Sequence, residues 1–77
     1  MDNNIEYRIK NVMSAVFEIP IQGINNESSS DTISSWDSLK HMNLVIALEE
    51  EFKIQFSDNE ILEMTNFGLL KKIIGFY

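Results

Sequence analysis

The sequence predicts an all-α fold, a four-helix bundle with three longer helices, one short third helix and a long first loop. Apolar residues recur at the spacing of one helical face in the segments that begin near residues 4, 38 and 65. Short polar residues that favour helix caps precede the second, third and fourth segments. With 77 residues, of which 44% are hydrophobic, the chain is expected to form one domain, residues 1–77, around a packed core.

The composition narrows the classes of function. Six Lys and Arg against twelve Asp and Glu give a net charge of −6, which repels nucleic acid and anionic membrane surfaces and favours basic partner surfaces. The chain has no cysteine, so any thiol chemistry must come from an attached group. It shows neither a secretory leader nor an apolar run long enough to span a membrane. We therefore expect a cytoplasmic protein without membrane insertion.

The first helix is predicted from residue 4 to residue 17. Its apolar residues fall on one face: Ile5, Ile9, Val12, Met13, Val16 and Phe17. Pro20 cannot continue the helix, so the helix should end near Glu18 or Ile19.

A long connection follows over residues 21–36. Gly23, Asn25, Asn26 and the serine run of residues 28–30 favour local turns over regular structure. We expect the serine run to be solvated, since nothing nearby supplies an arginine-rich acceptor for a phosphorylation cluster. Four apolar residues should anchor the loop to the core: Ile21, Ile24, Ile33 and Trp36.

The second helix is predicted from Ser38 to about Phe52, and its start is the most informative point of the sequence. Asp37 suits the N-cap, which places the Ser38 hydroxyl on the first turn. Backbone N–H groups and the positive end of the helix dipole converge there and would stabilise a phosphate on that oxygen. Taken alone this signal is weak, because many helices begin with Asp-Ser for capping only.

The second helix carries two apolar faces. One contains Leu44, Val45, Leu48 and Phe52, and the other contains Leu39, Met42 and Ile46. The first face fills the core; pattern alone leaves the second either buried or exposed to partners. The run of Glu49, Glu50 and Glu51 is likewise either a solvated helix end or an acidic docking patch. His41 is interpreted as a packed, hydrogen-bonded histidine, because one histidine makes no metal site.

Two further helices are predicted near the C-terminus. Ser57 and Glu60 fit a capping box that begins a short third helix ending near Met64. Its apolar residues, Ile61, Leu62 and Met64, should pack against the second helix. Thr65 is predicted to cap the fourth helix, which would run to Tyr77.

With these elements placed, the sequence resembles the acyl carrier and peptidyl carrier proteins, small four-helix bundles that bear a 4′-phosphopantetheine arm. The resemblance covers almost the whole chain. It rests on Asp37-Ser38-Leu39 followed by Leu44, Leu48-Glu49-Glu50, Phe52, Ile54, the cap at Ser57 and Thr65 before the last helix.

The resemblance implies a role for each matching residue. Ser38 would bear the covalent 4′-phosphopantetheine arm, and Asp37 and Leu39 would flank it for recognition by a phosphopantetheinyl transferase. The arm's thiol would hold acyl or aminoacyl groups as thioesters, delivered by a loading ligase to downstream transferases or synthases. The chain itself would be no enzyme and would act as a monomer. The partner-docking surface would comprise Leu39, Met42, Ile46, Glu49 and Glu50.

The resemblance also bears on the pathway. Lys40 and Asn43 occupy positions that are often acidic in carriers of fatty acid biosynthesis. Together with Trp36 and His41, they look more like carriers of specialised pathways such as polyketide, nonribosomal peptide, or saccharide and lipid assembly. The chain ends at Tyr77 without a linker and so resembles a free-standing carrier, although an excised domain of a larger enzyme would look similar.

Two other classes of function remain open. A cofactor-free helical adaptor would dock partners through the second helix and use Ser38 only to start it. A hydrolase would use Ser38, His41 and Asp37, but adjacency in sequence is not a catalytic triad, and no oxyanion donors are identifiable.

Overall fold

The computed structural model describes residues 2–77, with side chains from residue 5 onward, and confirms the all-α prediction. The helices in chain order are α1 (Asp2–Phe17), a 3₁₀ turn η1 (Ile21–Gly23), α2 (Ser38–Phe52), α3 (Asp58–Glu63) and α4 (Phe67–Gly75). Within residues 2–77 there is no strand, only an isolated antiparallel bridge between Ser29 and Asn66. None of these helices has the length and apolar character that crossing a membrane requires.

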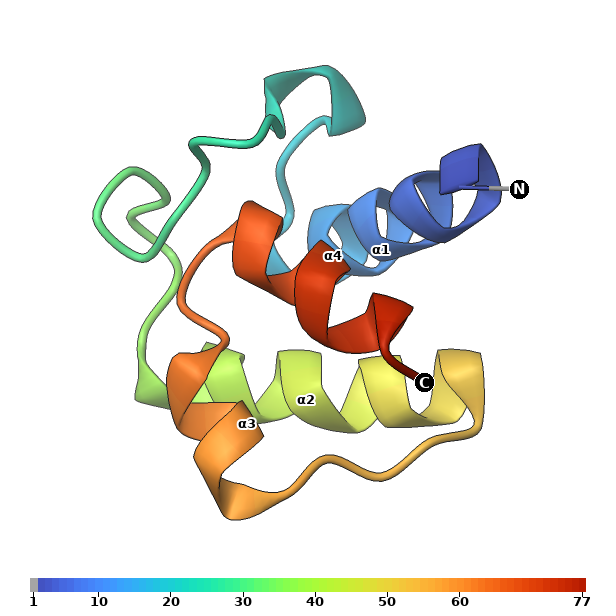
Figure 1. Ribbon diagram of the computed structural model, residues 1–77. Helices are drawn as coiled ribbons and strands as arrows, with labels where there is room; N and C mark the ends of the chain where they lie inside the picture. Colours follow the sequence, from blue (N-terminus) through green and yellow to red (C-terminus); the bar gives the residue numbers. More distant parts are fainter. Residues whose placement is uncertain (1) are drawn as a thin grey trace.

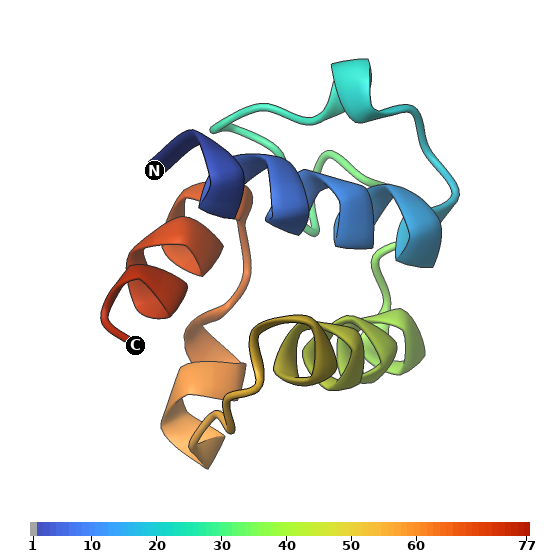
Figure 2. The ribbon, with the colours of Figure 1, turned by 90° about the vertical axis from the view of Figure 1, so that its right-hand side faces the viewer.

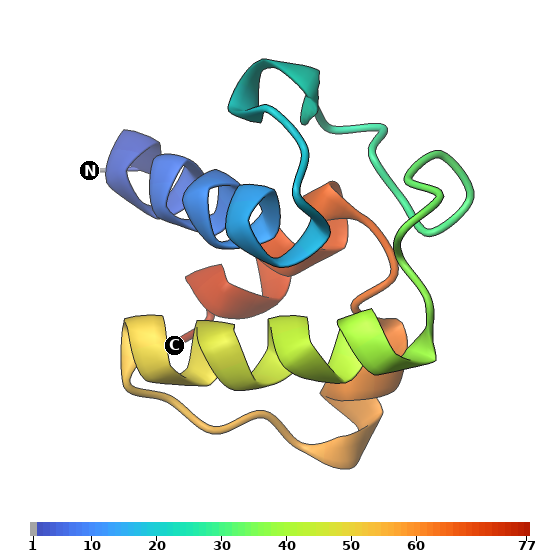
Figure 3. The ribbon, with the colours of Figure 1, turned by 180° about the vertical axis from the view of Figure 1, so that it is seen from behind.

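The four helices enclose one core. Helix α1 packs against α2 on one side and against α4 on another, and the long loop arches over the end of the bundle (Figure 1, Figure 2). After α2 the chain turns back along that helix, so that α3 lies beside the start of α2 (Figure 3). This reversal places α3 next to Ser38 although twenty residues separate the two in sequence.

The core is one cluster, and α3 contributes to it only through the partly buried Ile61. Its buried side chains include residues from α1, α2 and α4 and from the loops: Ile9, Met13, Phe17, Ile24, Ile33, Trp36, Leu44, Val45, Leu48, Phe56, Met64, Phe67, Leu70, Ile73 and Ile74. The predicted inner face of the second helix therefore lies in the core. Phe52 packs against this core while partly buried.

The start of α2 and the C-terminal ends of α1 and α2 follow the expected local rules. Asp37 accepts the Lys40 N–H at 2.8 Å and caps α2, as predicted. Helix α1 ends at Phe17 because Glu18 adopts the left-handed conformation (φ 57°), and the Ile19 N–H then bonds back to the Ser14 carbonyl. Lys53 ends α2 in the same way, with φ 57°.

The long loop is more ordered than its composition predicted. The expectation that the serine run is solvated is wrong for Ser28, which is only 4% exposed. Its hydroxyl accepts the Asn25 N–H, and its carbonyl accepts the Phe67 N–H. Burial follows because this backbone pairs with the α3–α4 connection, and buried polar groups require partners. Ile24, Ile33 and Trp36 are buried anchors as predicted, whereas Ile21 is only half-buried at the start of η1.

The last two helices need three corrections. The cap of α4 is Asn66, which accepts the Leu69 N–H at 2.7 Å, and not Thr65, whose carbonyl instead accepts the Ser30 N–H. Helix α4 ends at Gly75, so Tyr77 lies outside it. Leu62 does not pack against α2, because a six-residue helix offers one narrow inner face, and Leu62 lies on the outer one. The capping box of Ser57 and Glu60 is present as predicted.

Candidate functional site

Ser38 stands exposed on the first turn of α2. The Asp37 carboxylate takes the Lys40 N–H, and the Asp37 carbonyl takes the His41 N–H at 2.8 Å, which is the first bond of the helix ladder. The N–H groups of Ser38 and Leu39 lie ahead of that ladder, where a helix has no internal partner for them. A negatively charged group on the Ser38 oxygen would meet these donors and the positive helix terminus.

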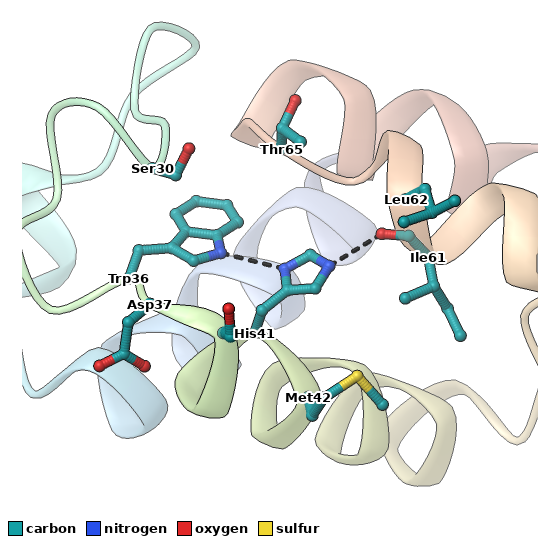
Figure 4. A pocket seen from close by; sticks show the side chains of 9 residues that line it. Ser30, Trp36, Asp37, His41, Met42, Ile61, Leu62 and Thr65 are labelled. Atoms are coloured by element: carbon teal, nitrogen blue, oxygen red, sulfur yellow. Dashed lines mark hydrogen bonds between the residues drawn. The ribbon is translucent and has the colours of Figure 1, made fainter.

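A groove of about 490 Å³ opens beside Ser38, between the start of α2, the second half of α3 with the α3–α4 connection, and the long loop (Figure 4). Nine residues line it: Ser30, Trp36, Asp37, Ser38, His41, Met42, Ile61, Leu62 and Thr65. The sequence alone predicts only part of this set as site residues. Ser30, Ile61, Leu62 and Thr65 were missed as site residues, because only the fold brings two distant segments to the serine.

His41 joins three elements at the groove through its two ring nitrogens. The Trp36 indole N–H donates to His41 Nδ1 at 3.0 Å, and His41 Nε2 lies 2.8 Å from the Ile61 carbonyl oxygen (Figure 4). An indole nitrogen can only donate, so Nδ1 accepts and the proton resides on Nε2. This confirms the prediction of a packed, hydrogen-bonded histidine.

The same contacts argue against a hydrolase. In a catalytic triad the carboxylate orients the histidine, and the histidine accepts the serine proton. Here Trp36 and Ile61 occupy both nitrogens of His41, while Asp37 bonds to the backbone of α2. Ser38, His41 and Asp37 are therefore neighbours without a relay between them.

Helix α3 forms one wall of the groove, and contacts with Tyr77 hold its start in place. The Tyr77 hydroxyl donates to the Glu60 carboxylate and lies 3.1 Å from the Gln55 carbonyl oxygen, and the Tyr77 ring meets Phe56 edge to face. The hydrogen bond from Tyr77 is the main cause that lowers the pKa of Glu60, and the same bond raises the pKa of Tyr77. Tyr77 is exposed and Glu60 is only half-buried, so these shifts report contact rather than large stabilisation.

The second apolar face of α2 is exposed. Leu39, Met42 and Ile46 are 71%, 46% and 52% exposed, and Leu62 of α3 is 75% exposed. The structure thus decides the question that the helical pattern left open: this face does not fill the core. Exposed apolar side chains gathered on a small protein are typical of an interaction surface.

The chain was compared with known proteins by sequence and by structure. No protein-family model matches it. The acyl carrier protein of Buchnera aphidicola subsp. Schizaphis graminum is 42% identical over 59 residues, 75% of this chain and 73% of the relative. That of Buchnera aphidicola subsp. Baizongia pistaciae is 35% identical over 75 residues, 92% of this chain and 96% of the relative. The chain belongs to the acyl carrier protein family.

A solved structure agrees. The solution structure of the holo acyl carrier protein from Geobacter metallireducens superposes with a TM-score of 0.81 at 31% identity, covering 91% of this chain and 80% of the other. Acyl carrier proteins are carriers and not enzymes. As a family they generally carry phosphopantetheine and interact with synthases and transferases.

The residues at Ser38 fit such an arm. The hydroxyl is exposed, two backbone N–H groups precede the helix ladder, and the one acidic side chain lining the groove, Asp37, is engaged by the Lys40 N–H. In the part of the chain that the structure describes, no group of three or more His, Cys, Asp or Glu side chains is placed to hold a metal ion.

The three glutamates at the end of α2 are not equivalent in this carrier. Glu51 receives Arg8 Nε at 2.6 Å, and the guanidinium also lies 4.4 Å from the centre of the Phe52 ring. Glu49 is half-buried and accepts the Phe56 N–H at 2.9 Å. Glu50 remains as an exposed carboxylate. The interpretation of the run as one solvated end or one acidic patch is therefore too simple, because two members tie α2 to neighbouring segments.

Lys40 and Asn43 also differ. Lys40 Nζ donates to the Val16 carbonyl at 3.2 Å and lies 3.8 Å from the Glu18 carboxylate. Its ammonium therefore stabilises the C-terminal end of α1, where carbonyls lack helical partners. Asn43 is exposed on α2 beside the apolar face. The charge of Lys40 is thus directed away from the face that carries Met42 and Ile46.

Proposed function

We propose that Ser38 bears a 4′-phosphopantetheine arm whose thiol holds acyl or aminoacyl intermediates as thioesters and delivers them to biosynthetic enzymes. The observation that carries this proposal is the position of Ser38: an exposed hydroxyl on the first turn of a capped helix, beside an open groove, in a member of the acyl carrier protein family. The absence of cysteine is consistent with it, since the arm would supply the thiol.

Each residue at the site has a definite task in this proposal. Ser38 forms the phosphodiester, and the N–H groups of Ser38 and Leu39 with the α2 dipole stabilise its charge. Asp37 holds the first turn through its bond to Lys40 N–H, and Asp37 and Leu39 flank the serine for recognition by a phosphopantetheinyl transferase. The arm, when bound, supplies a reactive thioester; the protein supplies tethering, which raises the effective concentration of the cargo at a docked enzyme.

The exposed face of α2 would meet the partner enzymes. Leu39, Met42 and Ile46 supply apolar contact, and Glu50 supplies a charge for basic partner surfaces. Glu49 would contribute less, because its carboxylate is held by Phe56. The proposed partners are the phosphopantetheinyl transferase, an acyl- or aminoacyl-loading ligase, and downstream transferases or synthases. Residues 1–77 would act as one carrier domain, monomeric and cytoplasmic.

A specialised pathway, such as polyketide or nonribosomal peptide biosynthesis, is proposed over housekeeping fatty acid biosynthesis. Asn43 is a neutral residue on the exposed face of α2. The Lys40 ammonium contacts the C-terminal end of α1 and not this face. The exposed face near Ser38 is therefore more apolar and carries fewer acidic side chains than a face complementary to a strongly basic partner would carry.

Loading in vitro tests the attachment. The purified protein is incubated with coenzyme A and a broad-specificity transferase, and intact mass is measured beside a known carrier. We expect one phosphopantetheine increment on the wild type and on Ser34→Ala, an exposed loop serine that serves as the matched control, and none on Ser38→Ala. An unmodified wild type under conditions that load the known carrier would contradict the proposal and favour the cofactor-free adaptor.

Kinetics with fatty acid synthesis enzymes test the pathway. We expect the loaded protein to be a poor substrate for a malonyl transferase of fatty acid synthesis, with kcat/KM several-fold below that of a fatty-acid carrier. Asn43→Glu should raise kcat/KM by restoring charge to the exposed face. Wild-type kinetics equal to those of the fatty-acid carrier would return the protein to the housekeeping pathway.

A further inference from the structure

The groove beside Ser38 has a composition that bears on what the arm carries, and the inference below rests on the proposed attachment. Apolar surface comes from Trp36, Met42, Ile61 and Leu62. Hydroxyl groups come from Ser30 and Thr65, which Figure 4 shows together on the side away from Met42. The groove therefore offers apolar contact together with hydrogen-bonding groups within the reach of a flexible arm on Ser38.

The inner side of this groove is closed by a chain of hydrogen bonds. Trp36, His41 and the Ile61 carbonyl are linked in series from the loop through α2 to α3 (Figure 4). Trp36 is itself fixed in the core, stacked on Phe17 with ring centres 4.8 Å apart. His41 thus links α3 to a tryptophan that is buried in the core.

Helix α3 depends on tertiary contacts of this kind for its position. At six residues it is too short to be stable by itself, so tertiary contacts decide where it lies. The Tyr77 and Glu60 contact holds its start, and the bond from His41 to Ile61 holds its second half. Behind it, Leu44, Leu48 and Met64 are completely buried. A long alkyl chain could enter the core only by moving α3 and displacing these side chains.

We propose that His41 is a positioning residue that keeps α3 closed on α2, so that the group carried on Ser38 stays in the surface groove. The groove then selects a short acyl or aminoacyl group that combines an apolar part with a hydrogen-bonding group. Trp36, Met42 and Leu62 contact the apolar part, and Ser30 and Thr65 receive the polar part. Long unbranched chains gain no buried site in this protein.

The test compares chain lengths in loaded protein. Wild type, His41→Gln and His41→Leu are loaded with butyryl or dodecanoyl pantetheine, and intact mass confirms loading before any other measurement. Gln retains one acceptor and one donor, whereas Leu retains neither. Amide chemical shifts are recorded by NMR, and cleavage of the thioester by hydroxylamine is timed. Because loading is established first, failure of attachment at Ser38 is distinguished from failure of this inference.

For wild type and His41→Gln we expect both cargoes to shift amides of the groove residues only, with similar cleavage rates for the two lengths. In His41→Leu, loss of two hydrogen bonds should raise the fraction of molecules in which α3 has moved away from α2 by about tenfold. Dodecanoyl should then shift the amides of Leu44 and Met64, and its cleavage should slow several-fold relative to butyryl.

Two results would overturn the inference: shifts at Leu44 and Met64 in dodecanoyl-loaded wild type, or a His41→Leu variant that is folded and behaves as wild type. If His41→Leu does not fold, Trp36→Phe takes its place, since it keeps an aromatic ring beside Phe17 and removes the indole donor. The same increase in core shifts is expected, and their absence in folded Trp36→Phe would equally contradict the role of the bridge.

Discussion

The two apolar faces of α2 carry similar side chains in opposite environments. Leu44, Val45 and Leu48 are buried against α1 and the rest of the core, while Leu39, Met42 and Ile46 face solvent on the same helix. Core formation does not explain why the second set is apolar, because apolar area that stays exposed does not stabilise the fold. The difference indicates that the inner face is needed for stability, and the proposed role of the outer face is contact with partner enzymes.

The largest effect on stability should come from the inner face. Leu48→Ala removes completely buried methyl groups and leaves a cavity, so we expect a loss of about 2–5 kcal/mol in the free energy of unfolding. Urea denaturation followed by circular dichroism measures it. A loss no larger than that of a surface substitution would show that this face is not the core.

The outer face should respond in the opposite way. Ile46→Ala is expected to change the free energy of unfolding by no more than about 0.5 kcal/mol, because the side chain is half exposed. The KM of the phosphopantetheinyl transferase should rise several-fold, since its contact surface is reduced. Unchanged kinetics for Ile46→Ala and Met42→Ala together would contradict the assignment of this face to docking.

The cap at the first turn of α2 should have an effect on stability between those of the two faces. Asp37→Ala removes the acceptor for the Lys40 N–H and should destabilise the protein by about 1 kcal/mol. Asp37→Asn keeps that acceptor, so its stability should stay near that of the wild type. If both variants retain wild-type stability but load slowly, Asp37 acts in recognition alone and not as the cap.

The smallest effect concerns polar contacts at the edge of α3. Tyr77→Phe removes the bond that lowers the pKa of Glu60, so the pKa of that carboxyl should rise when measured by NMR titration. A lowered carboxyl pKa adds stability above the unfolded value of 4.5 that is lost as pH falls through the folded value. The raised pKa of Tyr77 adds stability below 10.0 that is lost as pH rises through the folded value.

The stability difference between wild type and Tyr77→Phe should therefore be constant between these limits and shrink outside them. A difference that does not change with pH would mean that the Phe56 contact, and not the hydrogen bond to Glu60, anchors Tyr77.

The sequence predicts α2, α3 and the end of α1 well, because their boundaries depend on local contacts. The Asp37 cap, the capping box of Ser57 and Glu60 and the stop before Pro20 all depend on residues within one turn. The predicted cap of α4 was wrong by one residue. Thr65 and Asn66 are both suitable caps, and pairing of this segment with the Ser28–Ser30 loop decides between them.

The proposed attachment serine could be selected from sequence, whereas the groove beside it could not. Ser38 lies within one local motif, but the groove joins the loop, α2 and α3, which meet only when the chain reverses after α2. For the same reason the bond from His41 to the Ile61 carbonyl has no signature in either segment. Lys40 and Glu49 were interpreted as surface charges, because their backbone partners on distant segments are invisible in a helical pattern.

Site-specific mass spectrometry tests most directly whether Ser38 bears the proposed arm. Protein isolated from its native host is digested, and the peptide that contains Ser34, Ser35 and Ser38 is fragmented by mass spectrometry. We expect a phosphopantetheine mass on Ser38 alone, with or without an acyl group on its thiol. An unmodified peptide, or the same mass on Ser34 or Ser35, would contradict the assignment of Ser38 as the attachment site.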